Sequence, residues 1–238
     1  MNYNDCKSCT FFKGGIFMKR EEQGSFKITN DTMYHLSGFL LMISGAIYMI
    51  VQLIHPDGQL ENAGTRMWFT VALLSMVMSL FIFIGLVGIY VRQVKESGVL
   101  GLLGILLTGL FWLLSMTFAF IEAFVLPLIA SSSPEFVSGM MGLFDATPDE
   151  TNLGVFPFIV GIAGFLYVFG GFAFGFATAR ARVFPKAPAM TFAFAALFTV
   201  FASFVPYPVN RIFAVPMAFA LCWLGWAQVF MKPEQKKN

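Results

Sequence analysis

Charge is scarce in this sequence. Only 12% of the 238 residues are Asp, Glu, Lys or Arg, whereas 58% are hydrophobic. Soluble domains average about a quarter charged residues and less than half apolar ones, so a soluble fold of this length could not bury so much apolar surface. The formal net charge of +2 is too small to indicate a nucleic-acid partner. We therefore expect a protein whose main partner is the lipid bilayer.

Residues that bind metals or form disulfides are also few. The two histidines, His35 and His55, lie at opposite ends of the first apolar run and cannot share one metal ion within a monomer. Cys6 and Cys9 form a CxxC pair, but no second Cys or His pair completes a tetrahedral zinc site. Together with Cys222 they do not make the disulfide pattern of a secreted domain. The sequence predicts no metal and no cofactor.

Sequence signatures of catalysis are missing as well. No Gly-x-Ser-x-Gly turn presents a nucleophilic serine, and no phosphate-binding glycine loop joins a strand to a helix. An intramembrane site assembled from scattered residues would leave no such signature, so an enzyme is disfavoured without being excluded. A cleavable signal peptide is not expected either, because a long polar stretch precedes the first apolar run.

Long apolar runs are what the sequence does contain. About 20 apolar residues in helical form cross the hydrocarbon core, where no water can satisfy free backbone groups. We predict an all-α, polytopic transmembrane helix bundle at residues 33–231, between polar cytoplasmic tails at 1–32 and 232–238. The six predicted spans are Leu36 to Ile54, Met67 to Val91, Val99 to Ile129, Val155 to Ala179, Ala189 to Val205 and Ile212 to Phe230.

The distribution of Lys and Arg predicts the orientation. Thirteen of the 15 basic residues fall in the two tails and in the second and fourth loops, whereas the other three loops hold only Arg66 and Arg211. Cytoplasmic loops carry the excess of Lys and Arg. We therefore expect both termini in the cytoplasm.

The longest exterior segment, Ala130 to Gly154, has four acidic residues and no basic one. Its Ser-Pro and Thr-Pro elements predict loop structure. The apolar stretch from Phe136 to Phe144 is typical of a short interfacial helix.

The N-terminal tail also raises a question about the start of translation. Lys13-Gly14-Gly15 can be encoded by a purine-rich run that resembles a bacterial ribosome-binding site, and Met18 follows closely. We expect translation to begin at Met18, which would make residues 1–17 an artefact. The intact mass of the natively expressed protein tests this expectation, and a species that includes Cys6 would contradict it.

Small residues recur at helical spacing on two predicted spans. Gly101, Gly104 and Thr108 lie on one side of the third span, and a second stripe on the fourth span contains Gly171, Gly175 and Ala179. Such stripes let helix backbones approach closely in lipid. Packing within the chain is favoured over homodimerisation, because six spans supply many internal neighbours.

Glu122 is the one ionisable residue inside a predicted span, a position that is costly and by default functional. Counted from Val99 it lies roughly 34 Å along the helix, near the exterior boundary. We expect it to pair with Arg211 or to accept a hydrogen bond from His55. The full candidate polar cluster is Glu122, His55, Asp57, Arg66, Asn210 and Arg211. It either lines an outward-facing vestibule or is a set of helix-end residues at a wet interface, and the sequence leaves both interpretations open.

Three stretches of the sequence carry a resemblance. They are the glycine-rich run 85–104, the segment Glu122-Ala-Phe-Val-Leu-Pro127, and the closing Trp223-Leu-Gly-Trp226. From Met33 onward the chain resembles a loose group of small bacterial multi-pass membrane proteins of unknown function. This resemblance implies the bacterial plasma membrane and nothing about a substrate.

The leading functional hypothesis is transport or sensing of a small or lipophilic solute through the exterior polar cluster. The alternative is an accessory subunit that binds another membrane protein through a glycine or phenylalanine face, which the shortage of buried charges fits. A membrane-embedded enzyme is the third class, and it would require Glu122, His55 and Arg211 to converge on one cavity.

Overall fold

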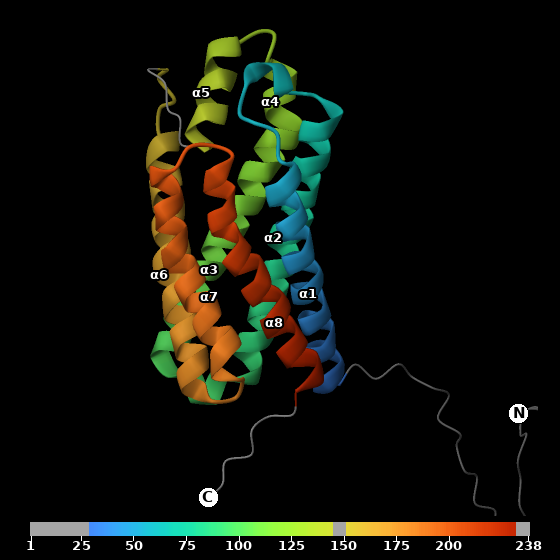
Figure 1. Cartoon of the computed structure of the whole chain (residues 1–238), viewed down its shortest axis with the longest axis vertical. Helices are drawn as coiled ribbons and strands as arrows, with labels where there is room; N and C mark the ends of the chain where they lie inside the picture. Colours follow the sequence, from blue (N-terminus) through green and yellow to red (C-terminus); the bar gives the residue numbers. More distant parts are fainter. Residues whose placement is uncertain (1–28, 145–150, 232–238) are drawn as a thin grey trace, which may run out of the picture.

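The computed structural model describes residues 29–144 and 151–231, which form helices joined by short loops with no β-strand among them (Figure 1). Five helices in these two segments are long and apolar enough to cross a membrane, and a further apolar helix is shorter. The all-α prediction is thus confirmed. The CxxC pair, Met18, the C-terminal tail and the Thr147-Pro148 element lie outside the described residues.

Helices α1 (Asn30–Ile54) and α2 (Arg66–Arg92) begin at threonine caps. The side chain of Thr29 accepts a hydrogen bond from the backbone N–H of Thr32 at 3.2 Å, and Thr65 does the same for Trp68 at 3.2 Å. Such caps satisfy N–H groups that have no partner within the helix. The connection between the two helices contains the short 3₁₀ helix η1 (Leu60–Asn62).

The third predicted span is a composite helix. It starts as α3 (Val94–Phe120), turns sharply at Gly98 (φ 61°), continues as the π-helical segment η2 (Ile121–Val125) and ends as α4 (Leu126–Ile129). The predicted interruption near Pro127 therefore takes the form of a π-turn just before the proline. Helix α5 (Pro134–Phe144) follows, where the sequence predicts a short interfacial helix.

The C-terminal part forms a long helix and a shorter hairpin. Helix α6 (Phe156–Ala181) is followed by α7 (Lys186–Phe198), which continues as the 3₁₀ helix η3 (Thr199–Phe204). A second 3₁₀ segment, η4 (Val209–Ala214), leads directly into α8 (Val215–Phe230). The shortest predicted span thus corresponds to α7 with η3.

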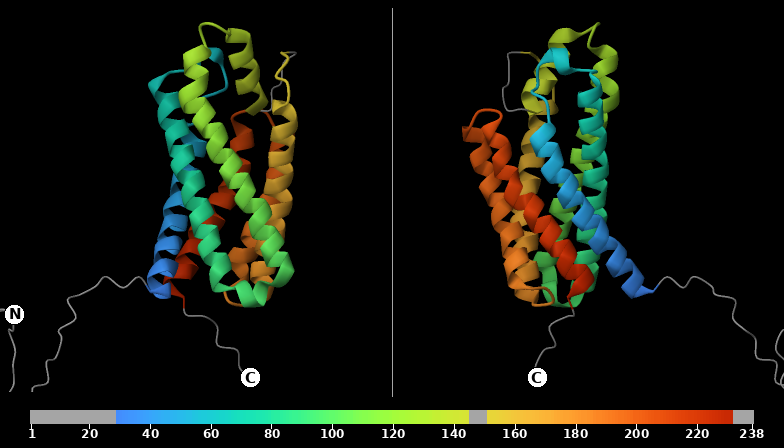
Figure 2. Two further views of the ribbon diagram at one scale, coloured as in Figure 1. Left: turned by 180° about the vertical axis from the view of Figure 1, so that it is seen from behind. Right: turned by 45° about the vertical axis from the view of Figure 1, so that its right-hand side comes forward.

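The helices form one bundle in which sequence neighbours are not the only spatial neighbours. Helix α1 packs on α2 and α8, α3 packs on α2 and α6, and α7 packs on α6 and α8. The start of α1 and the end of α8 lie at the same end of the bundle, here called the inner end (Figure 1). At the opposite, outer end, α4 and α5 project beyond the connection between η3 and η4 (Figure 2).

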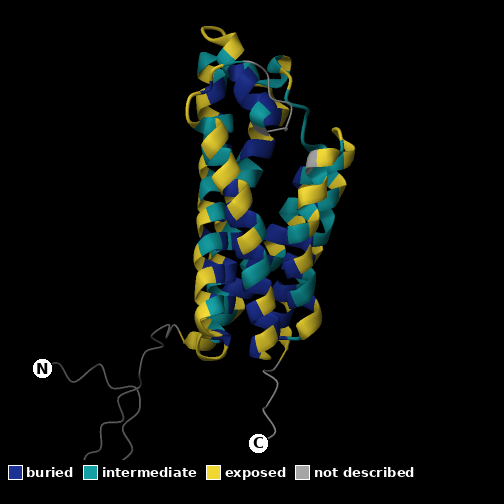
Figure 3. Ribbon diagram, turned by 90° about the vertical axis from the view of Figure 1, so that its left-hand side faces the viewer, coloured by how far each residue is buried: buried dark blue, intermediate teal, exposed yellow. Residues whose placement is uncertain are grey.

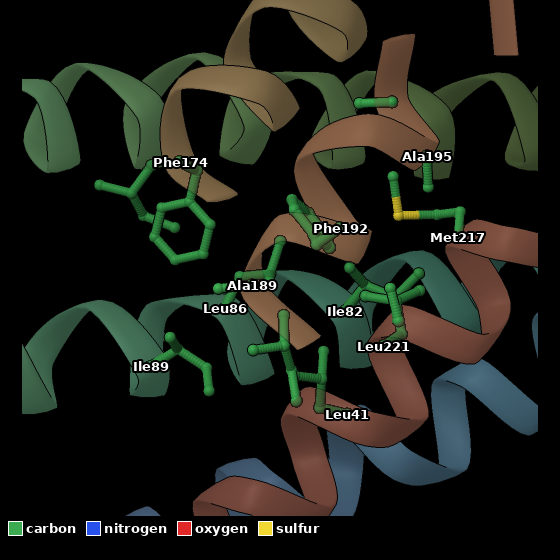
Figure 4. Close-up of a cluster of buried hydrophobic side chains, with 14 of the residues drawn as sticks. Leu41, Ile82, Leu86, Ile89, Phe174, Ala189, Phe192, Ala195, Met217 and Leu221 are labelled. Carbon is green, nitrogen blue, oxygen red and sulfur yellow. The ribbon is translucent and has the colours of Figure 1, made fainter. Parts of the chain in front are cut away.

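The main core joins α1, α2, α3, α6, α7 and α8, and Figure 4 shows part of it. Leu41, Ile82, Phe174, Phe192 and Leu221 are all completely buried there. Exposed residues cover the outward faces of the helices (Figure 3), and most of the large ones are apolar. Lipid is as apolar as these side chains, so close van der Waals packing rather than water exclusion holds such a core together.

The predicted small-residue stripes lie in two of the helix contacts. A Cβ at Gly104 would fall 2.5 Å from the backbone nitrogen of Phe174 on α6, and the side chain of Thr108 is buried in the same contact region. Gly171 and Gly175 face α7 instead, the latter with a hypothetical Cβ 2.7 Å from the Ala193 nitrogen. Gly101 lies against Ser97 and Ala177, and Ala179 is buried.

A third close contact, between α1 and α8, is not among the predicted stripes. A Cβ at Gly225 would fall 2.6 Å from the carbonyl oxygen of Gly38, and one at Gly38 would fall 2.9 Å from the carbonyl oxygen of Gly225. Gly45 lies equally close to Ala218 and Cys222. These glycines bring the first and the last helix into backbone contact, because no side chain fits between them.

Candidate functional site

His55 is held at the outer end of α1 by the proline that follows it. Pro56 disfavours the helical conformation of the preceding residue, and His55 is extended (φ −63°, ψ 122°) while its N–H still bonds to the Val51 carbonyl at 3.0 Å. The helix therefore ends with the imidazole directed into the outer part of the bundle, half-buried and beside η4.

The segment before α8 supplies the partners of His55. Arg211 in η4 donates a hydrogen bond from Nη2 to the His55 Nδ1 at 3.1 Å. The Tyr207 hydroxyl donates to the His55 carbonyl oxygen at 2.8 Å, and the Arg211 guanidinium lies 5.7 Å from the Tyr207 ring centroid. These contacts tie the end of α1 to the start of α8. Residues 156 positions apart in the sequence thus meet in one cluster.

The electrostatics of this cluster keep His55 neutral. Burial and the positive charge on Arg211 lower the pKa of His55 to about 4, and the contact with the Pro56 carbonyl opposes them only in part. At neutral pH the ring therefore carries no charge, which allows Nδ1 to accept from the guanidinium.

Trp68 connects His55 to the segment that contains Glu122. The two rings lie edge to face, with centroids 5.6 Å apart, and the Trp68 Nε1 donates to the carbonyl oxygen of Glu122 at 3.1 Å. In the π-turn the Leu126 N–H bonds to the Ile121 carbonyl. The next carbonyl, that of Glu122, would accept from residue 127, but a proline has no N–H. Pro127 thus frees the carbonyl that Trp68 binds.

The six predicted cluster residues are only partly brought together. His55 and Arg211 are in direct contact, and the main chain of Glu122 joins them through Trp68, while its carboxylate is on a half-buried side chain. Asp57 instead accepts from the Asn62 amide within the loop between α1 and α2. Arg66 is exposed at the first position of α2.

Asn210 precedes Arg211 in η4. Its Oδ1 is buried and has no hydrogen-bond partner among the described residues. A buried acceptor without a donor is uncommon in folded proteins, so this oxygen offers a place for a donor from outside the chain.

Sequence reasoning missed two residues of the site. Trp68 sits in the first turn of α2, where a tryptophan is ordinarily explained as an interfacial anchor. Tyr207 lies between two prolines, in what the sequence predicts as a simple turn. The available signal was the residue types: the Trp68 N–H needs an acceptor because the ring is buried, and Tyr207 has a hydroxyl that can donate.

An aromatic row continues from the cluster into the bundle. The Trp112 ring lies 6.1 Å from Tyr48 and 6.3 Å from Tyr167, in edge-to-face geometry. Tyr48 also lies within electrostatic reach of Arg211. The Thr199 hydroxyl donates to the Ala195 carbonyl at 2.8 Å and lies 3.3 Å from the Tyr167 hydroxyl.

Trp112 itself has an unused donor. The side chain is 2% exposed, and its Nε1 has no acceptor among the described residues. A buried N–H without an acceptor costs about 1–3 kcal/mol. The row therefore presents a donor that an oxygen-bearing molecule would satisfy.

A second polar cluster lies at the inner end, and its hydrogen bonds cap and connect the ends of helices. Arg92 donates to the Gln228 carbonyl at 2.6 Å and to that of Met231 at 3.3 Å, which satisfies carbonyls at the C-terminus of α8. Gln93 donates to Thr178 at 2.6 Å, which joins α3 to α6. This arrangement holds four helix ends together, so the outer cluster is the better candidate for a functional site.

A metal site is not supported within the described segments. No group of three or more His, Cys, Asp or Glu side chains comes together there. Comparisons with protein-family models, curated proteins and solved structures found no match to this chain.

Proposed function

We propose that the chain crosses the plasma membrane of a bacterium six times, with both termini in the cytoplasm. Besides the five long helices, α7 and η3 together supply 13 and 6 residues. At about 1.5 Å per α-helical and 2.0 Å per 3₁₀ residue they extend roughly 31 Å, enough for a hydrocarbon core of about 30 Å. The basic residues at the inner end support a cytoplasmic location for that end.

We further propose that this protein binds a small or lipophilic solute at its outer end, for transport or sensing. The observation that carries this proposal is the half-buried Arg211 bonded to His55, a cation next to a neutral ring at the mouth of an aromatic row. A half-buried arginine is costly in a membrane protein, and such residues mark solute pathways. The Trp112 Nε1 in the bundle and the Asn210 Oδ1 in η4, neither of which has a hydrogen-bond partner in the part of the chain that the structure describes, supply further polar contacts nearby.

Native mass spectrometry of the protein, extracted gently from its own membrane, tests this proposal. We expect a lone chain that retains a small molecule or lipid, and we expect Arg211→Gln to lose it. Arg66→Gln is the matched control, because Arg66 is an exposed arginine at the same end of the bundle. A wild-type chain without any bound molecule, or equal retention in both variants, would contradict a solute site at Arg211.

An accessory subunit is the second candidate, and one observation favours it. The predicted glycine stripes are used inside the bundle, but α7 and α8 border an open apolar groove of about 500 Å³ lined by Phe194, Phe198, Phe201 and Pro216. A partner helix fits such a surface as well as lipid does. A stoichiometric protein partner in the same mass spectra, lost in Phe194→Ala, would support this candidate over solute binding.

A membrane-embedded enzyme is the least supported class. With a pKa of about 4, His55 is a weak base at neutral pH. Its Nδ1 is also occupied by Arg211.

A further inference from the structure

The outer half of the bundle interior contains a layer of side chains that indicates the class of solute. Tyr48, Trp112, Tyr167 and Thr199 form this layer, here called the polar layer. We propose that the solute is an uncharged molecule with an apolar body and a hydrogen-bond-accepting oxygen, and that this oxygen accepts from the Trp112 Nε1. This inference rests on the proposed solute site and adds the chemistry that its inner part recognises.

Six helices surround the polar layer in a closed ring. Each helix packs on the next in the order α1, α2, α3, α6, α7 and α8, and α8 packs back on α1. Tyr48 comes from α1, Trp112 from α3, Tyr167 from α6 and Thr199 from the start of η3. These side chains from four segments contact one another. The polar layer therefore lies inside the ring and not on its lipid-facing surface.

Helical spacing gives the depth of the polar layer. His55 and Tyr48 are seven residues apart, so they lie on nearly the same face of α1 and about 10 Å apart along its axis. Seven positions further inward from Tyr48, Trp112 and Tyr167 the chain has the buried apolar side chains of Leu41, Ile105 and Phe174. Figure 4 shows two of these, Leu41 and Phe174, within the core. The polar layer thus has an apolar floor below it.

The Trp112 Nε1 is a donor of this layer that still needs an acceptor. The Tyr48 and Tyr167 hydroxyls bond to each other, and the Tyr167 hydroxyl also lies 3.3 Å from that of Thr199. The Trp112 side chain is 2% exposed, and its Nε1 has no acceptor within residues 29–144 and 151–231. An indole N–H can only donate, so the group that completes the layer has to be an acceptor.

A carbonyl or ether oxygen suits this position better than a water molecule does. A buried water makes about two to four hydrogen bonds, whereas the hydroxyls here already bond to one another and Trp112 supplies a single donor. A carbonyl oxygen needs only one donor, because it has no hydrogen of its own to place. The carbon body attached to it would lie against the apolar floor.

The polar layer also favours a solute without charge. None of its four side chains is charged at neutral pH, and a charge buried without an ionised partner is costly. The Phe111 ring lies 4.9 Å from the Trp112 ring and 4.7 Å from the Tyr167 ring, which adds apolar surface. An apolar molecule gains little here over lipid, so its oxygen is the feature that the layer would select.

The indole N–H signals of the full-length protein in detergent micelles test this inference. With ¹⁵N in the tryptophan side chains, the four tryptophans give four indole resonances, and Trp112→Phe identifies the one from Trp112. The probes are cyclohexanone and methylenecyclohexane, which have nearly the same shape and differ in the oxygen acceptor. We expect cyclohexanone to move the Trp112 signal downfield until it saturates, and methylenecyclohexane to leave it nearly in place.

Isothermal titration, corrected with empty micelles, measures the preference between the probes. We expect cyclohexanone to bind at least about fivefold more tightly, the factor that corresponds to one net hydrogen bond. Trp112→Phe keeps a ring but removes the donor, so this preference should disappear. Trp226→Phe is the matched control, because Trp226 is 43% exposed and contacts Phe230 at the inner end. If Trp112→Phe does not fold, the Trp112 signal is assigned by elimination with Phe variants of the other three tryptophans, and the wild-type response decides.

The outcomes separate this inference from the proposed function. Equal binding of the two probes, a preference that survives in folded Trp112→Phe, or a Trp112 signal that cyclohexanone leaves in place would each overturn it. The last result is the one expected if a water molecule already occupies the donor. Native mass spectrometry detects a retained molecule of any class, so a retained molecule there without a response here would leave the solute site standing and remove only the solute class.

Discussion

At the scale of single residues, the lowered pKa of His55 should make the stability of the protein depend on pH. The pKa of His55 is about 4 in the folded protein and about 6.5 in an unfolded chain. Between these values the unfolded state binds more protons, so stability falls as pH drops from about 6.5 to about 4. Allowing for the partial exposure of the ring, we expect a loss of roughly 1–2 kcal/mol.

Thermal unfolding in detergent at pH 7.5, 5.5 and 4 measures this effect. His55→Gln removes the titrating group but keeps an acceptor for Arg211, so we expect its unfolding temperature to vary less over this range. His35→Gln is the control, since His35 is exposed at the inner end. Identical pH dependence in all three proteins would contradict the assignment.

The Trp68 indole nitrogen has a structural task that a phenylalanine cannot perform. Trp68→Phe keeps an aromatic ring beside His55 but leaves the Glu122 carbonyl without its donor. We expect a loss of about 1–3 kcal/mol of stability, the cost of an unsatisfied buried acceptor, measured by chemical or thermal unfolding. Trp223→Phe in α8 should cost less, because Trp223 makes only ring contacts among the described residues.

The sequence predicts part of the site at this scale. His55 and Arg211 are named from their place at helix ends, and Glu122 from its place inside a span. Their pairing depends on how α1 and η4 cross, which no local pattern encodes. Asp57 accepts a hydrogen bond from Asn62 in its own loop instead of joining the cluster, and the side chain of Arg66 is exposed. Helical period and residue type could not distinguish the residues that join the cluster from those that lie outside it.

At the scale of elements, Pro127 sets the geometry of the composite helix. Pro127→Ala would supply an N–H at residue 127. In an α-helix this N–H bonds to the Ala123 carbonyl and the Leu126 N–H bonds to the Glu122 carbonyl, so we expect the π-turn to revert toward an α-helix. The Glu122 carbonyl would then no longer need Trp68. In the Pro127→Ala background we expect Trp68→Phe to lower the free energy of unfolding by less than half as much as it does in the wild type. An unchanged cost in this double-mutant cycle would show that the bond does not depend on the proline.

The contact between α1 and α8 is an element-level constraint that the predicted small-residue stripes do not include. Gly225→Ala would place a methyl group 2.6 Å from the Gly38 carbonyl, where only backbone could move. We expect a loss of about 1–3 kcal/mol, measured as a lower unfolding temperature. Gly161→Ala is the matched control, because a Cβ there meets nothing within 4 Å and alanine favours a helix by up to about 1 kcal/mol.

Element positions were predictable because length and apolarity decide them. Each predicted span has a helical counterpart, and the Pro127 interruption was read from one residue type. The α1–α8 contact was not predictable in this way, since Gly38, Gly45 and Gly225 do not stand out from other glycines in the chain. A glycine stripe shows that a close contact is available and does not say with which helix.

For the whole molecule, the bundle is tied at both ends by residues far apart in the sequence. Arg211 and Tyr207 bind the end of α1 at the outer end, and Arg92 binds the end of α8 at the inner end. Between them the core is apolar and closely packed. The inner end of the bundle is therefore closed by hydrogen bonds. A sensor that binds a solute at the outer cluster can keep these bonds, whereas a transporter would have to open them.

The number of crossings is the property of the whole molecule that most needs a test, because α7 is shorter than the five helices that are long enough to span a membrane. Single cysteines placed in a chain whose own three are changed to serine can be probed in intact cells with a membrane-impermeant maleimide. With six crossings we expect Ser132→Cys and Val209→Cys to be labelled from outside, and Glu96→Cys only after the cells are opened. All three positions are exposed in the structure, so access to the reagent is decided by the membrane alone.

If α7 did not cross, residue 209 would lie on the same side as residue 96, and its labelling in intact cells would be lost while that of residue 132 remained. The outer cluster would then have to be placed anew, because Arg211 belongs to the same connection as Val209.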